Sequence, residues 1–208
     1  MTNDLKHILR SVEYAEVTIE SNKAPILLSI WKSCEEDRCI VFYPGTATHP
    51  LFYETFLSAL ACNNFNVIGV HPVCHGNSPR VKKIFDFEEL VQNGMDAVTY
   101  AIKNLNKNIV VMGSSQGGIV AIALAGKDKR IQAVFPHNIL VPSIPDSITV
   151  TRFPNILKKV YRPVVQMVKL VAKVLPELPI PVRFYLDLKK VSGDKQIIKQ
   201  FIAILTDL

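Results

Sequence analysis

The feature that most constrains this chain is the stretch Gly-Ser-Ser-Gln-Gly at residues 113–117. An apolar run at 109–112, typical of a buried strand, precedes it, and an apolar segment at 118–125, typical of a helix, follows it. Gly-x-Ser-x-Gly between a strand and a helix favours a strained turn, whose glycines approach the backbone too closely for side chains. Ser115, with glycine two positions before and two after it, is the candidate nucleophile. A Gly/Ser turn without chemistry is the alternative.

The order of the other segments predicts an α/β fold. Strand-like and helix-like segments alternate over residues 1–140, which is typical of a mostly parallel sheet with helices on both faces. The two opening strands alternate apolar and polar residues and are joined by a short turn, so they predict a hairpin. Strands are predicted at 15–21, 25–32, 39–43, 66–70, 109–112 and 131–135, and helices at 52–60, after Asp86 and at 118–125. Asp86 with Glu89 three positions later resembles a capping box.

A serine that attacks an acyl group also needs donors for the negative charge that develops on the substrate oxygen. Losing one such donor costs about 2.7–4 kcal/mol of barrier. The backbone N–H of Gln116, directly after the candidate nucleophile, would be one donor. The second would come from the Pro44-Gly45-Thr46 turn after the third predicted strand, with Thr46 as the candidate and Gly45 as its neighbouring alternative. Taken by itself, this Pro-Gly pair would indicate only a turn.

Three motifs in chain order carry a resemblance to a known family. They are Phe-Tyr-Pro-Gly-Thr at 42–46, His-Gly-Asn-Ser at 75–78 and Gly-Ser-Ser-Gln-Gly at 113–117. Over about residues 15–140 the chain resembles α/β-hydrolases of the lysophospholipase, monoacylglycerol-lipase and serine-aminopeptidase-like group. The resemblance implies a nucleophile elbow at Ser115, an oxyanion hole in the loop after the third strand, and a helical cap after the sixth. The chain departs from the family pattern at Pro44, where many members have His, and at Cys74, where they have Gly.

The resemblance also implies an acid after a seventh strand and a histidine after an eighth. Neither strand is recognisable, so the chain is expected to be C-terminally truncated relative to the family, without these two groups. Among the five histidines, His75 is expected to stabilise a turn. His137 is the best substitute base, because it ends the sixth predicted strand, where open α/β sheets place their sites, and Asp146 would orient it. Without a base, a serine hydroxyl keeps its proton, so activity on acyl esters would be weak or absent.

Composition argues against several other classes of protein. Apolar residues make up 49% of the chain and charged residues 20%, as in globular domains. The four cysteines lack CxxC spacing, which indicates neutral thiols rather than a disulfide scaffold or a metal site, and no cofactor is expected. The first ten residues have no signal-peptide core and no apolar run reaches about 18 residues, so a cytoplasmic location is predicted. The basic residues match no nucleic-acid-binding module.

The chain changes character at about residue 141. Seven prolines interrupt the remainder, and 152–199 carries eleven Lys and Arg against three acidic residues in a chain of net charge +6. We expect 141–208 to form a basic, mostly helical cap, whose helix at 162–175 has a broad apolar face and a basic stripe. This face would line a lipophilic entrance while the cations contact anionic head groups, or it would pack on the sheet with its lysines solvated.

Two functions from different classes therefore stay open. One is a serine hydrolase, complete or truncated, acting on a small acyl ester or a lipid. The other is a non-catalytic protein that keeps the hydrolase core and binds a membrane surface or a partner. Without a seventh strand, the strand at 131–135 would be an unpaired sheet edge, so a homodimer through this edge is also expected.

Overall fold

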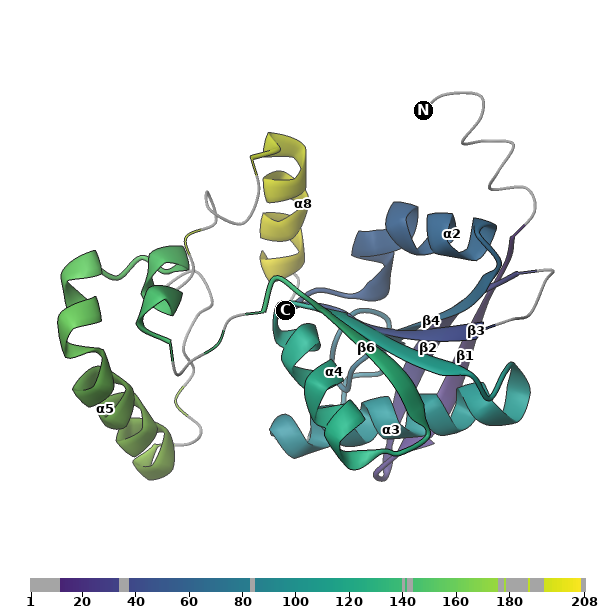
Figure 1. The fold of residues 1–208 in the computed structure, drawn as a ribbon, viewed down its shortest axis with the longest axis horizontal. Coiled ribbons are helices and arrows are strands. Elements are labelled where there is room, and N and C mark those ends of the chain that lie inside the picture. The colour runs from purple at the N-terminus through teal and green to yellow at the C-terminus, as the bar shows by residue number, and fades with distance from the viewer. Residues whose placement is uncertain are drawn as a thin grey trace. The chain divides into compact units, whose positions relative to one another are not determined.

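A computed structural model describes residues 12–33, 38–82, 85–139, 141, 144–175, 178, 187 and 193–206. The chain divides into two compact units, Met1–Ile139 and Leu140–Leu208. The first unit is a layered sheet with helices on both faces (Figure 1). The second consists, in its described part, mainly of helices.

The sheet of the first unit has six strands and is mostly parallel, as predicted. The strands are β1 (Glu13–Ser21), β2 (Ala24–Lys32), β3 (Arg38–Tyr43), β4 (Phe65–His71), β5 (Ile109–Ser114) and β6 (Ile131–His137). Their order is β1-β2-β4-β3-β5-β6, in which β3 pairs in parallel with β4 and β5, and β5 pairs in parallel with β6. β3 and β4 are buried along nearly their whole length, because they lie in the middle of the sheet under helices on both faces.

The first two strands form the predicted hairpin. Asn22 and Lys23 connect them, with φ of 46° and 66°. Two consecutive left-handed residues match the right-handed twist of the flanking strands, and asparagine tolerates this conformation better than most side chains. The hairpin adds an antiparallel edge to the parallel part of the sheet, since β2 also pairs antiparallel with β4.

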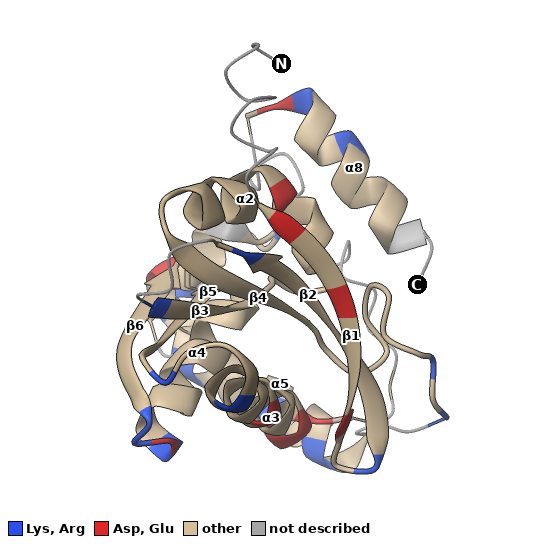
Figure 2. Cartoon of the chain, turned by 90° about the vertical axis from the view of Figure 1, so that its right-hand side faces the viewer, with Lys and Arg blue, Asp and Glu red and all other residues tan. Residues whose placement is uncertain are grey.

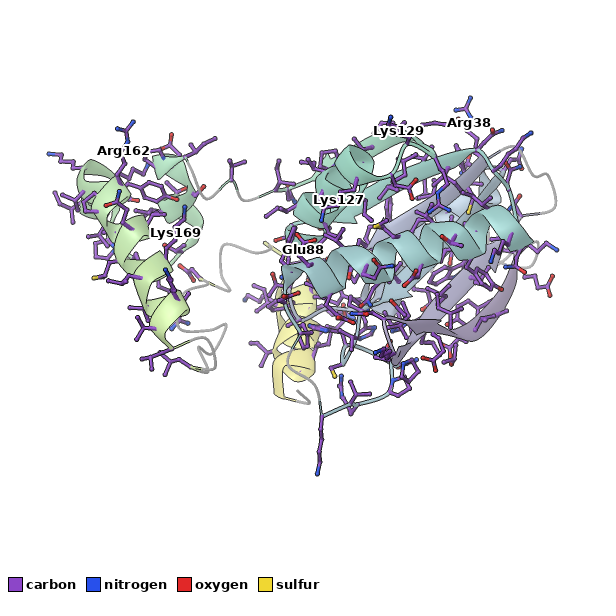
Figure 3. All side chains as sticks on the ribbon, turned by 90° about the horizontal axis from the view of Figure 1, so that it is seen from below. Arg38, Glu88, Lys127, Lys129, Arg162 and Lys169 are labelled. Carbon is purple, nitrogen blue, oxygen red and sulfur yellow. The ribbon has the colours of Figure 1, made fainter. Side chains whose placement is uncertain are left out.

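The helices of the first unit are α2 (Glu54–Cys62), α3 (Phe87–Asn104) and α4 (Gln116–Lys127), with the short 3-10 helix η2 (Pro50–Tyr53) before α2. α2 lies on one face of the sheet, and α3 and α4 lie on the other (Figure 1). The predicted cap at the start of α3 is present, because the side chain of Asp86 accepts a hydrogen bond of 2.9 Å from the N–H of Glu89. Lys127 of α4 forms an ion pair with Glu88 of α3 (Figure 3).

The sheet separates two hydrophobic clusters. The larger lies between the sheet and the α3/α4 layer and includes Val41, Val98 and Leu124, whereas the smaller lies under α2 and includes Leu57. Cys39 belongs to the larger cluster, and burial raises the pKa of its thiol to about 12. This thiol is therefore neutral at pH 7, as predicted for a buried cysteine.

The two outer strands of the sheet differ in chemistry. β1 carries acidic residues, seen in Figure 2, and charge on an edge strand opposes pairing with another chain. β6 has no acidic residue, none of its residues is buried, and the side chain of Phe135 is 56% exposed. Within the described residues no strand pairs with the outer side of β6. A homodimer through this edge stays a prediction, and Pro136, which lacks an N–H, would restrict such pairing to the residues before it.

The second unit contains η3 (Pro145–Val150), η4 (Asn155–Val160), α5 (Tyr161–Val174) and α8 (Lys195–Thr206). α5 corresponds to the amphipathic helix predicted at 162–175, and none of its residues is buried. Arg162 and Lys169, labelled in Figure 3, belong to its basic stripe. No helix in the described ranges is long and apolar enough to cross a membrane. The role of this unit as a cap stays a prediction.

Candidate functional site

Ser115 occupies a sharp turn between β5 and α4. Its φ is 54° and its ψ is −117°, a left-handed backbone conformation that residues other than glycine rarely adopt. The backbone at this turn is tightly packed. A Cβ on Gly113 would lie 2.1 Å from the carbonyl oxygen of Gly117, and one on Gly117 would lie 2.1 Å from the carbonyl oxygen of Tyr43. Both positions therefore require glycine because the backbone approaches too closely for a side chain, as the Gly-x-Ser-x-Gly pattern predicts.

Parallel pairing brings three chain segments together at one edge of the sheet. Tyr43 at the end of β3 is paired with Gly113 of β5, and Ser114 of β5 is paired with His137 at the end of β6. The N–H of Ser115 donates a hydrogen bond of 2.8 Å to the carbonyl oxygen of His137. The turn after β3, the turn at Ser115 and the end of β6 are therefore neighbours at the edge where the sequence places its site residues.

The turn after β3 lies directly against Ser115. A Cβ on Gly45 would be 3.5 Å from the Cβ of Ser115 and 3.4 Å from the carbonyl oxygen of Ser114. The carbonyl oxygen of Gly45 accepts bonds of 3.1 Å and 2.8 Å from the N–H and the hydroxyl of Thr48, which hold the turn closed. Among the described residues, none of the hydrogen bonds uses the N–H of Thr46 or of Gln116. Their predicted role as oxyanion donors stays a prediction.

The start of α4 adds a favourable field at the same place. Gln116 is the first residue of this helix and directly follows Ser115. The N-terminus of a helix carries partial positive charge, which stabilises negative charge within the first turn. Ser115, Gln116 and Thr46 are all partly exposed to solvent.

His137 and Asp146 have different surroundings from Ser115. The imidazole of His137 is exposed and takes part in no hydrogen bond within the described part of the chain. The backbone carbonyl of His137 accepts the hydrogen bond from the N–H of Ser115. Asp146 belongs to the second unit, where its carboxylate forms an ion pair of 2.7 Å with Lys158. The roles of His137 and Asp146 in a triad stay predictions. In the described ranges, no three His, Cys, Asp or Glu side chains are grouped to hold a metal ion.

A histidine that no sequence motif singles out supports the next turn of the same sheet edge. His71, at the end of β4, is fully buried. Its Nδ1 accepts a hydrogen bond of 3.0 Å from the N–H of Asn77, so its proton lies on Nε2, which is 2.9 Å from the hydroxyl of Ser29. Burial, and then the nearby His49, lower the pKa of His71 to about 3. A neutral imidazole therefore joins β4, β2 and the turn at Asn77.

The His-Gly-Asn-Ser motif at 75–78 explains how this turn is packed. Gly76 has a φ of 51°, and a Cβ there would lie 2.3 Å from Nδ1 of His71 and 2.5 Å from Cβ of His49. The ring of His49 stacks on that of His71 with centroids 6.0 Å apart. Nδ1 of His75 is 2.8 Å from the carbonyl oxygen of Val73, which fits the turn-stabilising role predicted for it. The motif thus forms a tightly packed turn against the edge of the sheet.

The fold and the Gly-flanked serine define this chain as an α/β-hydrolase. Three solved structures share the fold at low identity. The α/β hydrolase GrgF from Penicillium sp. sh18 has a TM-score of 0.58 and 17% identity, and the match covers 81% of this chain and 57% of that one. The esterase Pf2001 from Pyrococcus furiosus has a TM-score of 0.60 and 19% identity, with coverage of 76% of this chain and 63% of that one. Brefeldin A esterase, a bacterial homologue of human hormone-sensitive lipase, has a TM-score of 0.54 and 18% identity, with coverage of 69% of this chain and 51% of that one. The chain spans 57% and 63% of the lengths of the first two.

The sequence itself assigns the family more narrowly. The family described as serine aminopeptidase, S33, matches residues 35–203, which is most of the chain. This chain therefore belongs to that family of α/β-hydrolases, and the resemblance drawn from the three motifs is confirmed. None of the curated proteins compared with the sequence matches it.

Proposed function

We propose that this chain is a serine esterase in which Ser115 is the nucleophile. The observation that carries the proposal is the strained backbone of Ser115, with φ 54° and ψ −117°, held between two glycines that tolerate no side chain. Strain of this kind costs about 1–3 kcal/mol and persists where the surrounding structure enforces it, often at catalytic positions. A Gly/Ser turn without chemistry would not need it.

The neighbouring groups fit the same reaction. The hydroxyl oxygen of Ser115 would attack the carbonyl carbon of an ester, and the carbonyl π electrons would move onto the oxygen. The N–H groups of Thr46 and Gln116 would bind that oxyanion, since neither is used in a hydrogen bond among the described residues. The base takes the serine proton during the attack and gives it to the leaving oxygen, so return of the electron pair expels the alcohol, and water then hydrolyses the acyl-enzyme. An acyl ester is therefore the proposed substrate class, consistent with the two esterases among the similar structures.

The proposed base is His137, at the end of β6. Its imidazole makes no hydrogen bond to Ser115 in the described residues, so it would have to approach the hydroxyl when substrate binds. Loss of the base in a serine protease lowers the rate about a millionfold, and about 10³–10⁴ over water remains from the oxyanion hole and binding. We therefore expect slow turnover unless His137 comes within reach of the Ser115 hydroxyl or a histidine of a second polypeptide completes the site.

A fluorophosphonate probe followed by intact-mass analysis tests the proposal. The probe should add to one residue, Ser115, and the adduct should be lost in Ser115→Ala. Ser114→Ala is the matched control, because it removes the neighbouring hydroxyl, and it should keep the adduct. Reaction should be sought from about pH 6 to 9, where a histidine base becomes neutral. No adduct at any pH, or an adduct that survives in Ser115→Ala, would overturn the proposal.

A second candidate function, binding to a membrane surface, is favoured by the exposure of α5. Met167 and Leu170 are each 61% exposed and Val174 is 66% exposed. These residues form one row on the helix, and beside it Arg162, Lys169 and Lys173 form the basic stripe. No acidic residue occurs in the helix. A helix of this composition binds in the interface of an anionic bilayer, with its apolar row among the acyl chains and its cations at the head groups.

Co-sedimentation with vesicles tests this second function. Vesicles containing phosphatidylserine should pellet the chain, and added salt should release it. Each Lys near such a surface contributes about 1 kcal/mol, so Lys169→Gln with Lys173→Gln should weaken binding roughly ten- to thirtyfold. Lys103→Gln with Lys129→Gln makes the same charge change on the first unit and should have little effect. Equal binding of both double variants would contradict a role for α5.

A further inference from the structure

Tyr53 places a phenol hydroxyl beside the turn that contacts Ser115. The N–H of Gly45 donates a hydrogen bond of 3.4 Å to the hydroxyl oxygen of Tyr53. A Cβ built on Gly45 would lie 3.1 Å from that oxygen and 3.5 Å from the Cβ of Ser115. The hydroxyl of Tyr53 and the side chain of Ser115 therefore flank the same small space, which exists because Gly45 has no side chain.

The ring of Tyr53 is held firmly in this position. It packs edge-on against Phe42 of β3, with ring centroids 4.9 Å apart, and against Phe52 at 5.1 Å. Phe42 belongs to the buried cluster under α2. Aromatic pairs of this geometry contribute about 0.5–1.5 kcal/mol beyond area burial. The hydroxyl is thus carried by a ring with little freedom, which is the property required of a preorganised donor.

The proton of the Tyr53 hydroxyl is not committed elsewhere. The oxygen accepts from Gly45, and in the described part of the chain the hydroxyl donates to no acceptor. A phenol has one proton to donate as well as lone pairs that accept. The acceptor side is used to hold the turn, so the donor side is left for a group that enters the space beside Ser115.

We propose that the Tyr53 hydroxyl is a third donor to the oxyanion formed at Ser115, an inference that rests on the proposed esterase function. While the bond between the Ser115 oxygen and the carbonyl carbon forms, the displaced π electrons collect on the substrate oxygen. Tyr53 donates a hydrogen bond to that oxygen and keeps its proton, and the base takes the proton of the serine. The donation ends when the carbonyl re-forms.

Comparison of Tyr53→Phe with the unaltered chain tests this assignment. The substitution keeps the ring and its packing on Phe42 and removes only the hydroxyl. Loss of one oxyanion-hole donor lowers catalysis about 10²–10³-fold where two donors act, so with three donors we expect a fall of about 10- to 100-fold. The second-order rate constant of fluorophosphonate labelling should fall by this factor. With a p-nitrophenyl ester, kcat should fall while KM stays within about twofold, because the hydroxyl acts on the transition state.

Tyr100→Phe is the matched control, since it removes a tyrosine hydroxyl from α3 on the opposite face of the sheet. It should label at the unaltered rate. If Tyr53 only held the turn, Tyr53→Phe would lower the melting temperature or raise KM, and either result without a fall in kcat would overturn the inference. Equal labelling rates for Tyr53→Phe and the unaltered chain would overturn it while leaving the esterase proposal intact. Failure of the unaltered chain to label would overturn both.

Discussion

The Gly117→Ala variant is expected to lose about 3–5 kcal/mol of folding stability, a large fraction of the roughly 5–15 kcal/mol that holds a domain folded. The added Cβ would lie 2.1 Å from the carbonyl oxygen of Tyr43 and 2.3 Å from that of Pro44. Both atoms are backbone and belong to the end of the buried strand β3 and the turn after it, so neither can rotate away. Relief would require α4 to separate from the sheet. Urea unfolding followed by circular dichroism would measure the loss.

Gly126→Ala is the matched control for this prediction. It makes the same substitution in the same helix, but nothing lies within 4 Å of the added Cβ. Because alanine has a higher helix propensity than glycine, this variant should be more stable than the unaltered chain, by up to about 1 kcal/mol. If both variants unfolded at the same urea concentration, the close approach at Gly117 would not be a constraint on the fold.

The parts of the fold that could be predicted from the sequence are those encoded by neighbouring residues. Strand and helix positions follow from hydrophobic periodicity, and the start of α3 follows from Asp86 and Glu89, which are three residues apart. The Ser115 turn follows from glycines two residues on either side. The alternation of strand and helix segments then indicates a mostly parallel sheet, but not the order of its strands. All of this information is local or is carried by short motifs.

The parts of the candidate site that could not be predicted depend on contacts between distant residues. The bond from His71 to Ser29 joins positions 42 residues apart, and no local pattern records it. Whether a histidine at a strand end is buried or exposed depends on what packs over it, so His71 and His137 look alike in the sequence although only His71 is buried. Tyr53 falls in an aromatic segment that predicts only helix and core. Its hydroxyl matters because the chain folds back onto Gly45, eight residues earlier.

The stability of the chain is expected to fall as the pH is lowered from about 6.5 towards 3, because His71 is neutral in the fold. Its folded pKa is about 3, below the 6.5 of an unfolded histidine. Above pH 6.5 the imidazole is neutral in both states and contributes no pH dependence. Below pH 6.5 the unfolded chain binds a proton at His71 and the folded chain does not, which favours unfolding by up to about 1.4 kcal/mol per pH unit. Between pH 6.5 and 5 this one group should lower the free energy of unfolding by about 2 kcal/mol.

Burial also lowers the pKa values of His49 and His75, so they add to the loss with the same sign. The contribution of His71 is therefore isolated by His71→Gln, whose amide has a donor and an acceptor for Ser29 and Asn77 but does not titrate. This variant should be less stable than the unaltered chain at pH 7, because an amide fills the buried site less well.

Between pH 6.5 and 5 the His71→Gln variant should lose about 2 kcal/mol less than the unaltered chain. Urea unfolding at pH 7, 6.5, 6, 5.5 and 5 measures both curves, and carboxylates titrate mostly below this window. Parallel curves would mean that His71 takes up its proton equally in the folded and unfolded chain. The hydrogen bonds of His71 with Ser29 and Asn77 would then break in acid without loss of the fold. These bonds could therefore not be what holds the turn at Asn77 against the sheet.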